Sequence, residues 1–409
     1  MRRPFKGRGL RLAAESQRLI NHAQGMLQAA SRLEERGWEQ QLDLLLQKTL
    51  KNQHQEHIDA ALDHLFKSQP DAYDILIDAV EANSESCLLE HEGATYQALL
   101  IAAPILAWTR FAIPSGALSA EQIAPLFSHL HAHVLADDAR LAIAPLLYSI
   151  DQLPRNHVET HAAVRRMADA ALKGATLQSP TDLPETTPFL ADTRYLLAAI
   201  VAPVGAPLFC WQASANPPDR QQALAHWQEQ AGPNVARLLP GCGIDLLLPD
   251  AFFLTCREAD KQIRPASVKA AVHFLTHALD AQPDRLQAVI GGFSEETANG
   301  QIDEYRISFL PRPGDEVVYG LVWPLYGDEN ADHDTADLST ADAPPTRAPI
   351  QDIIHMLNDE GIVHIKHHTE IFPVEFCDDC GAPLYCDLDG ELVHAEMPEE
   401  STQNATHLH

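Results

Sequence analysis

Two cysteines near the end of the chain carry the clearest chemical signal in the sequence. Cys377 and Cys380 are separated by two residues and followed by Gly381, within the segment FCDDCGAP at 376–383. Two thiolates at this spacing can bind one metal ion, and the glycine allows the backbone to turn back beneath it. The segment therefore predicts one half of a zinc-binding knuckle, without indicating a particular reaction.

A structural zinc ion needs four ligands in a tetrahedron, so two more residues are required. Cys386 and His394 follow on a predicted hairpin that turns at residues 387–390, and both are candidate ligands. The alternative ligands are three histidines on the predicted strand before the knuckle: His364, His367 and His368. We therefore expect a structural zinc site of Cys377, Cys380, Cys386 and His394. The competing interpretation is a cysteine turn that binds no metal.

A redox-active or nucleophilic cysteine has weaker support. Asp378 and Asp379 lie between the two thiols and are expected to raise the thiol pKa, which disfavours a reactive dithiol. Cys242 lies between Gly241 and Gly243, but the sequence does not locate a histidine that would act as its base. We interpret Cys242 as part of a turn before a strand.

Two other groups of polar residues, the histidines at 129–133 and the charged residues at 257–264, are interpreted as parts of exposed helix surfaces. His129 and His133 lie four residues apart, a separation that suits chelation, but the glutamate of an H-E-x-x-H site is missing. The charged stretch at 257–264 has helical spacing and predicts surface ion pairs. The expected pairs are Glu258 with Lys261 and Asp260 with Arg264. Motifs that bind nucleotide phosphates or carry a serine nucleophile do not occur, so the sequence assigns no cofactor-binding residue.

The overall charge argues against a general nucleic-acid-binding protein. The 409 residues include 57 acidic and 29 basic ones, and the net charge of −28 would repel a phosphate backbone. Residues 1–18 are the exception, because they hold six basic residues against one acidic residue, Glu15. This basic N-terminal arm is interpreted as a solvated terminus, and the alternative is an arm that binds RNA, an acidic partner or the protein's own acidic surface.

Composition places the chain among globular proteins. Apolar residues make up 45% and charged residues 21% of the sequence, and no apolar run approaches the ~20 residues of a membrane span. No signal-peptide pattern follows the first basic residues, and the odd number of cysteines, seven, argues against a disulfide framework. We expect a cytoplasmic protein with reduced cysteines and no membrane association.

The first part of the chain is expected to be entirely helical. Apolar residues such as Ala98 and Ala102 recur at helical spacing from residue 17 to about residue 174, with polar or proline-containing breaks between the runs. The pattern predicts an all-helical domain over 19–176, built as a bundle or as helical repeats. Proline, threonine, serine and aspartate are enriched at 177–188, where we expect a domain boundary.

After residue 189 the apolar runs become short, which predicts strands separated by helices. The predicted strands are 196–204, 207–211, 244–248, 286–293, 302–310, 317–323, 363–368 and 371–376. The predicted helices are 219–230, 251–262, 267–279 and 350–359. We therefore expect an α+β multidomain fold, in which the helical domain precedes a mixed α/β domain that ends in the knuckle hairpin.

The mixed domain is divided by an acidic segment. Residues 327–349 hold six acids and few large apolar residues, which predicts a flexible loop; a docking loop for a basic partner is the alternative. The α/β domain thus comprises 189–326 and 350–395, followed by a polar tail at 396–409. Both parts contain a helix, a glycine, a short apolar run and a cysteine in the same order, which suggests two related α/β halves.

Four pieces of sequence along the chain support a family assignment. They are the arginine-rich start, LPDAFF at 248–253, VWPLYG at 322–327, and CDDCG at 377–381 with HAE at 394–396. Together they resemble a family of proteobacterial proteins that is grouped only as a domain of unknown function. The resemblance spans nearly the whole chain and implies one full-length architecture, without implying any catalytic residue.

The sequence favours a cytosolic interaction or adaptor protein with a structural metal knuckle, because no motif requires catalysis. The first alternative is a zinc-dependent hydrolase, in which Cys377, Cys380 and a histidine leave one position open for water. The second alternative is an RNA-associated factor that uses the basic N-terminal arm. A protein partner is expected, and the sequence does not indicate its identity.

Overall fold

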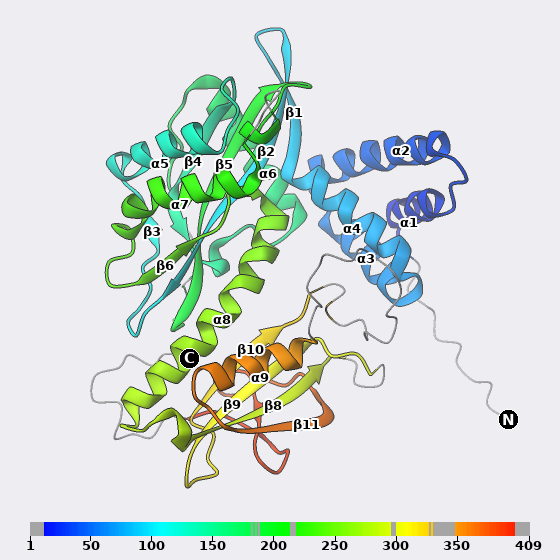
Figure 1. Ribbon diagram of the computed structural model, residues 1–409. Coiled ribbons are helices and arrows are strands. Elements are labelled where there is room, and N and C mark those ends of the chain that lie inside the picture. Colours follow the sequence, from blue (N-terminus) through cyan, green and yellow to red (C-terminus); the bar gives the residue numbers. More distant parts are fainter. Residues whose placement is uncertain are drawn as a thin grey trace, which may run out of the picture.

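The computed structural model describes residues 12–180, 183, 184, 186, 189–212, 218–295, 300–326, 329 and 348–396. In these parts the chain forms a unit of N-terminal helices and two sheet domains that share one long helix (Figure 1). The predicted fold class, N-terminal helices followed by a mixed α/β region, is confirmed. Most of the basic arm, of the acidic segment 327–349 and of the tail lies outside the described residues.

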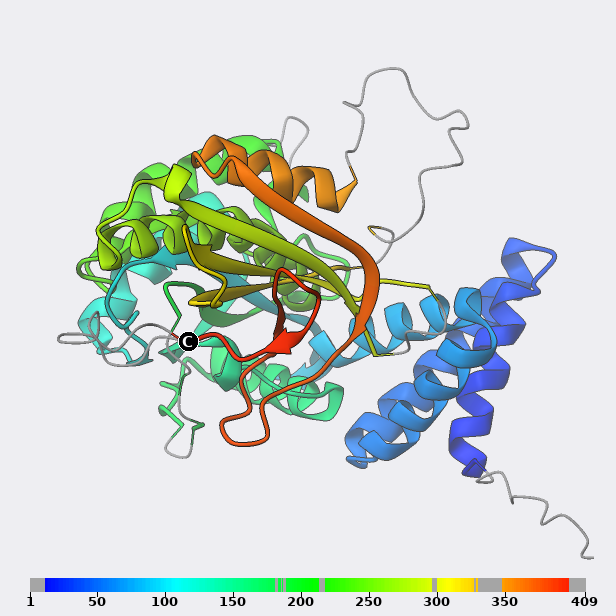
Figure 2. The ribbon, with the colours of Figure 1, turned by 90° about the horizontal axis from the view of Figure 1, so that it is seen from below.

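The N-terminal unit consists of α1 (Ala14–Leu27), α2 (Arg32–Lys51), α3 (Gln55–Ser68) and α4 (Pro70–Glu85). Each helix presents one apolar stripe to a shared core, which includes the fully buried Leu19 and Leu42. Ser31 caps α2 by accepting a hydrogen bond from the backbone N–H of Glu34. The unit stands to one side of the sheets in two perpendicular views (Figure 1, Figure 2).

The helical region ends at Glu85, so the prediction of an all-helical domain over 19–176 is wrong beyond that residue. The elements that follow are β1 (Ser86–His91), β2 (Ala94–Trp108), β3 (Gly116–Ala117), α5 (Ala120–His133), β4 (Arg140–Tyr148) and α6 (His157–Lys173). Ala98 and Ala102 lie on β2, which is buried on both faces along most of its length. A strand covered on both faces shows no polar alternation, and its continuous apolar run can also be fitted to helical spacing.

The first sheet is antiparallel and has the order β1-β2-β5-β4-β3. Its other strands are β5 (Ala191–Pro203) and the short β6 (Gly243–Leu246) and β7 (Asp250–Ala251), both of which also pair with β2. The pairing of β2 with β5 runs from Tyr96 opposite Pro203 to Trp108 opposite Ala191. The predicted boundary at 177–188 therefore lies inside this domain, on the connection from α6 to β5.

Alternate residues of the central strands face two helical layers. Ile101 and Ile105 of β2 pack towards α5 and α7 (Arg220–Ala236), whereas Leu100 and Leu106 pack towards α6 and the first part of α8 (Phe252–Ala278). The first domain therefore has three layers, with helices on both faces of the sheet (Figure 1).

The long helix α8 connects the two sheet domains. Phe252 and Ala259 lie in the core of the first domain, whereas Val268 and Leu275 lie in the core of the second. The sequence predicted two helices here, and the structure has one, with Pro265 inside it. Packing at both ends keeps the helix continuous, although the proline removes one backbone hydrogen bond.

The second sheet has the order β10-β9-β8-β11, with β11 parallel to β8. Its elements are β8 (Leu286–Ser294), β9 (Glu304–Pro311), β10 (Tyr319–Pro324), α9 (Pro349–Asp359) and β11 (His364–Pro373). One face packs against α8 and α9. The other face is covered by a small hairpin of β12 (Tyr385–Cys386) and β13 (Leu392–Val393), which lies away from α9 in Figure 2. This hairpin follows the predicted knuckle.

Three finer predictions need correction. The predicted strands 363–368 and 371–376 form the single strand β11, whose pairing with β8 is irregular after His367. The predicted strand 207–211 is wrong, because Cys210–Gln212 form a 3-10 turn, as do Ile150–Gln152 and Pro283–Arg285 elsewhere. The two α/β halves that the sequence suggested are not equivalent in topology, since β6 is antiparallel to β2 and β11 is parallel to β8.

Within the described residues, no helix has the length and apolar character needed to cross a membrane.

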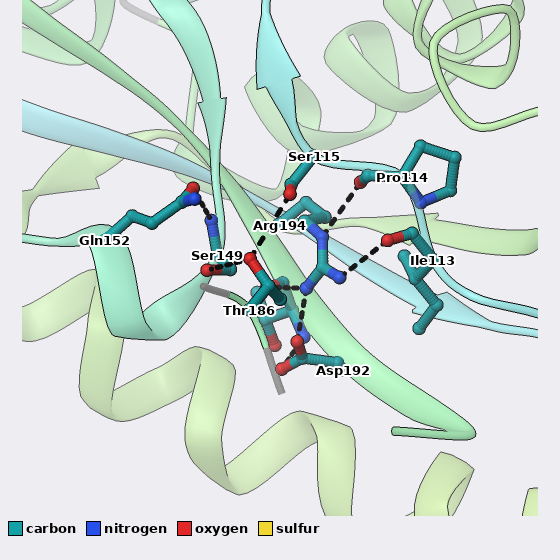
Figure 3. A network of polar contacts seen from close by, with 9 residues as sticks. Ile113, Pro114, Ser115, Ser149, Gln152, Thr186, Asp192 and Arg194 are labelled. Atoms are coloured by element: carbon teal, nitrogen blue, oxygen red, sulfur yellow. Dashed lines mark hydrogen bonds and ion pairs between the residues drawn. The ribbon is translucent and has the colours of Figure 1, made fainter. Parts of the chain in front are cut away.

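A buried arginine fastens a loop to the centre of the first sheet (Figure 3). Arg194 of β5 is 1% exposed and forms an ion pair with Asp192. Its Nε and Nη2 atoms donate hydrogen bonds to the carbonyls of Pro114 and Ile113, each at 2.9 Å. Because carbonyls and a carboxylate of the protein itself satisfy this guanidinium, we interpret the network as structural.

Candidate metal centre

The knuckle is a tight hairpin between β11 and β12. The backbone N–H of Cys377 donates to the carbonyl of Ala382 at 2.8 Å, and the N–H of Gly381 donates to the carbonyl of Cys377 at 2.8 Å. At its base, the N–H of Leu384 donates to the carbonyl of Glu375 at 3.1 Å. Gly381 has φ +72°, a left-handed conformation that favours glycine. The turn between Cys377 and Ala382 is therefore the one that the two-residue cysteine spacing and the following glycine predicted.

Three of the four predicted ligands meet at this hairpin. The ligand atoms of Cys377, Cys380 and His394 all lie within 4.8 Å of one another, and Cys380 Sγ lies 3.2 Å from His394 Nε2. Around a tetrahedral zinc ion, with bonds of about 2.3 Å to sulfur and about 2.0 Å to nitrogen, a sulfur and a nitrogen are ~3.5 Å apart. The cluster therefore has the donor atoms and spacing of a zinc site, and its residues are accessible from solvent.

Hydrogen bonds prepare one thiol for metal binding. The pKa of Cys377 is lowered, chiefly by the backbone N–H groups of Cys380 and Asp379 that donate to its sulfur, and also by the Cys380 side chain. The negative charge of Asp379 acts in the direction expected from the sequence and raises the pKa, but it is the weaker influence. The thiolate is the form that binds metal, so the turn itself favours ligation.

The two ring nitrogens of His394 face different neighbours. Its Nε2 atom faces Cys380, while its Nδ1 atom lies 3.3 Å from Glu396 Oε1 without forming a hydrogen bond. A metal-binding histidine usually has a carboxylate or carbonyl near its second ring nitrogen, and Glu396 is the nearby carboxylate here. Glu396 was placed in the polar tail by the sequence, so this neighbour was not predicted.

Cys386 does not join the other three residues, which corrects its prediction as a ligand. It lies on β12, is 0% exposed, and packs in the core between the hairpin and the second sheet. A Cβ atom on Gly291 of β8 would come within 2.7 Å of its Sγ, so the thiol fills the space that this glycine leaves. Burial raises the pKa of Cys386 to about 11, as expected of a core thiol.

The histidines proposed as alternative ligands also lie apart from the cluster. On β11, His368 Nε2 lies 2.9 Å from the carbonyl oxygen of Asp387, and the ring of His367 lies beside Tyr305. On α5, the rings of His129 and His133 stack with centroids 6.0 Å apart, and His129 Nε2 contacts Asn234. These contacts support a packing role for the histidines of β11 and for those of α5.

Cys242 is half-buried, and burial raises the pKa of its thiol.

A buried arginine that the sequence analysis did not single out supports the base of the knuckle. Arg306 of β9 is 0% exposed, and its Nη1 atom donates to the carbonyls of Glu375 and Leu384 at 2.8 and 2.5 Å. Its guanidinium carbon lies 4.4 Å from the ring centroid of Phe293, and its Nε pairs with Glu304. The available signal was an arginine between Tyr305 and Ile307 in a predicted strand, because a buried arginine requires specific partners.

The charged stretch 257–264 forms ion pairs mainly with other elements. Arg257 pairs with Glu81 of α4, and Arg264 pairs with Glu329, at 2.6 and 3.1 Å. Asp260 accepts a hydrogen bond from the hydroxyl of Tyr326 at 3.3 Å, in place of the predicted pair with Arg264. The predicted pair of Lys261 with Glu258 is present, at 3.7 Å. Burial raises the pKa of Asp260 to about 6.

Comparison with known proteins provides a family and no activity. A family model described as "Protein of unknown function (DUF2863)" matches residues 5–408. No curated protein and no solved structure matches the chain significantly. The family match includes the helical unit, both sheet domains and the cysteine knuckle.

Proposed function

The chain belongs to the family of proteins of unknown function DUF2863, and we propose that it is a non-catalytic interaction protein whose C-terminal hairpin is held by a zinc ion. The observation that carries this proposal is the convergence of Cys377, Cys380 and His394 within 4.8 Å. A zinc ion there would join the knuckle to the residue that follows β13, which ends at Val393.

The surroundings of the cluster support a structural rather than a catalytic ion. Arg306 fixes the base of the knuckle from the core, and Glu396 Oε1 lies near His394 Nδ1, the ring nitrogen that does not face Cys380. Two open, shallow hollows occur in the described part of the chain, one on α9 and one between α7 and β6. Neither is lined by a residue of the cluster.

A fourth ligand completes a structural zinc site. The described residues provide three ligands, so the fourth remains to be identified. If water takes the fourth position instead, the site has the composition of a catalytic zinc, with three protein ligands and one open position. The convergence of only three ligands among the described residues is the observation that keeps a zinc-dependent hydrolase as the second candidate function.

Metal analysis of the full-length protein tests the proposal. The zinc content by mass spectrometry should fall by one equivalent in a Cys377→Ser/Cys380→Ser variant and stay unchanged in a Cys210→Ser control. Equal zinc content in all three proteins would contradict the proposed centre. In a cobalt-substituted protein, azide should leave the thiolate-to-cobalt charge-transfer band unchanged if protein ligands fill the knuckle site, whereas a shift of that band would support the hydrolase.

An interaction partner can be sought through the same variant. The exposed Phe376 lies directly before the first ligand, and zinc binding would fix the backbone that presents it. A partner that binds the wild-type protein and not the Cys377→Ser/Cys380→Ser variant would support the interaction role. Binding that is unchanged after zinc removal would separate the partner surface from the metal centre.

A further inference from the structure

A second group of metal-ligating side chains lies in the N-terminal helical unit. Glu15 is in the first turn of α1, His54 immediately precedes α3, and His57 is in the first turn of α3. Glu15 Oε2 lies 3.5 Å from His54 Nδ1 and 3.4 Å from His57 Nε2, and the three ligand atoms all lie within 4.8 Å of one another. The group is formed by residues far apart in sequence, and the sequence analysis did not identify it.

These distances fit metal ligation better than direct hydrogen bonding. A histidine that donates to a carboxylate lies about 2.7–2.9 Å from it, and both nitrogens here are farther from the same oxygen. Nitrogen and oxygen ligands about 2.0–2.1 Å from a tetrahedral zinc ion are ~3.3 Å apart. His54 Nδ1 is also buried from solvent and, at 3.5 Å from Glu15 Oε2, makes no hydrogen bond of ordinary length with a described residue. Two imidazole nitrogens and a carboxylate oxygen that converge in this way can hold a cation between them.

The fold holds these side chains in place. The N–H of His54 donates to the carbonyl of Thr49 at 3.1 Å, and the N–H of His57 donates to the carbonyl of His54 at 3.2 Å. Next to the ligands, Leu19 and Ile58 are fully buried in the core that α1 and α3 share. The three ligands are half-buried at the edge of this core, where the backbone is well supported and solvent can still deliver an ion.

Lys48 sets the orientation of the carboxylate and competes with a metal for its charge. Its Nζ lies 3.3 Å from Glu15 Oε1, which leaves Oε2 directed at the two histidines. Glu56 Oε1 is the other carboxylate oxygen nearby, 3.9 Å from His57 Nε2. The cluster therefore offers two imidazole nitrogens and one carboxylate oxygen to an ion, with one neighbouring ammonium group.

We propose that Glu15, His54 and His57 bind a divalent transition-metal ion of the zinc type, which clamps α1 to the start of α3. Two imidazoles and one carboxylate are a donor set that zinc accepts readily, and the position left open can hold water. The site contains no sulfur and shares no residue with the cysteine knuckle. The proposal for this site therefore does not depend on whether the C-terminal cysteine knuckle binds a metal ion.

Cobalt(II) titration of the full-length protein distinguishes the two sites, because only the knuckle can give a thiolate-to-metal charge-transfer band. We expect two bound equivalents in the wild type and one in Cys377→Ser/Cys380→Ser, the latter without that band. Adding Glu15→Gln/His57→Gln to this variant should remove the remaining equivalent. Absence of cobalt binding by the cysteine variant would overturn the inference. One equivalent without the thiolate band in the wild type would support the helical site and contradict the knuckle instead.

Matched controls separate a built site from adventitious binding by histidines. His273 and His277 on α8 also have adjacent rings, with centroids 4.2 Å apart, but belong to no three-ligand group of the described residues. His273→Gln/His277→Gln should leave the cobalt stoichiometry unchanged, and loss of the same equivalent there would overturn the proposal. Lys48→Gln should tighten cobalt binding severalfold, and an unchanged affinity would remove Glu15 from the ligand set. Far-UV circular dichroism checks that each variant keeps its helices.

Discussion

The environment of a cysteine decides its role more than its position in a motif does. Cys386 and Cys380 are six residues apart, and the sequence predicted both as zinc ligands. In the structure Cys380 is exposed beside His394, whereas Cys386 fills a gap above Gly291. The pKa of Cys377 shows the same point, because backbone N–H donors outweigh the charge of the neighbouring Asp379.

Replacing the core thiol tests this distinction. Cys386→Ala should leave the zinc content unchanged and lower the free energy of unfolding by about 1 kcal/mol, since it removes one buried sulfur atom from a packed core. Metal analysis and urea unfolding measure the two effects. His394→Gln is the matched comparison, and it should lose zinc. Loss of zinc in the Cys386→Ala variant would return this residue to the ligand set.

The buried arginine beneath the knuckle gives a second prediction at this scale. Arg306→Met should lower the free energy of unfolding by about 3 kcal/mol, because it leaves buried carbonyls and the Glu304 carboxylate without their donor. It should also weaken zinc binding by about 10–100-fold, as expected when the support of a metal site is removed. Urea unfolding and competitive zinc titration check this. The exposed Arg312→Met should change neither quantity, and normal zinc affinity in Arg306→Met would contradict the supporting role.

At the scale of elements, buried strands were predictable where their apolar runs are short. β8 and β9 appeared close to their predicted positions, because the apolar runs there end at polar loops after eight or nine residues. β2 is apolar on both faces, so its pattern could not distinguish strand from helix. The continuity of α8 depends on two separate sheets that pack against it, which local sequence cannot show. The knuckle turn was predictable because Gly381 and two cysteines define it locally.

The contact of α4 with α8 predicts a pH-dependent stability. Glu85 accepts a hydrogen bond from the N–H of Phe253 at 3.0 Å, and burial raises its pKa to about 7. The folded protein therefore binds this proton more tightly than the unfolded chain does, so stability should fall as the pH rises from about 4.5 to 7. Glu85→Gln removes the titration and should stabilise the protein at pH 8 by up to ~3 kcal/mol.

Urea unfolding at pH 4.5 and pH 8 measures this effect. The difference between Glu85→Gln and the wild type should be small at the lower pH and largest at the higher pH. Glu92→Gln is the control, because Glu92 is 83% exposed and should show no such difference. Equal differences at both pH values would mean that the Glu85 carboxyl titrates alike in the folded and the unfolded protein, so that its burial does not govern its titration.

At the scale of the whole molecule, the two candidate metal sites lie at opposite ends of the chain, on its smallest cores. The knuckle hairpin packs through a minor cluster around Phe372 and Tyr385, whereas β2 and β5 share the large cores of the first domain. A small apolar core gives less stabilisation, so a metal ion contributes a larger share there. The site whose ligands lie close together along the chain was predictable from the sequence, whereas only tertiary packing brings Glu15 to two histidines.

Metal removal should therefore loosen the molecule locally. Hydrogen–deuterium exchange with and without a chelator should show faster exchange at 375–395 in the wild type, and no chelator effect there in Cys377→Ser/Cys380→Ser. β2 and β5 should exchange equally slowly in every sample, because their hydrogen bonds lie under helices on both faces. Faster exchange across the first sheet after chelation would show that the ion stabilises the entire fold. Unchanged exchange at 375–395 would mean that the hairpin is stable on its own packing and on Arg306, without a metal ion.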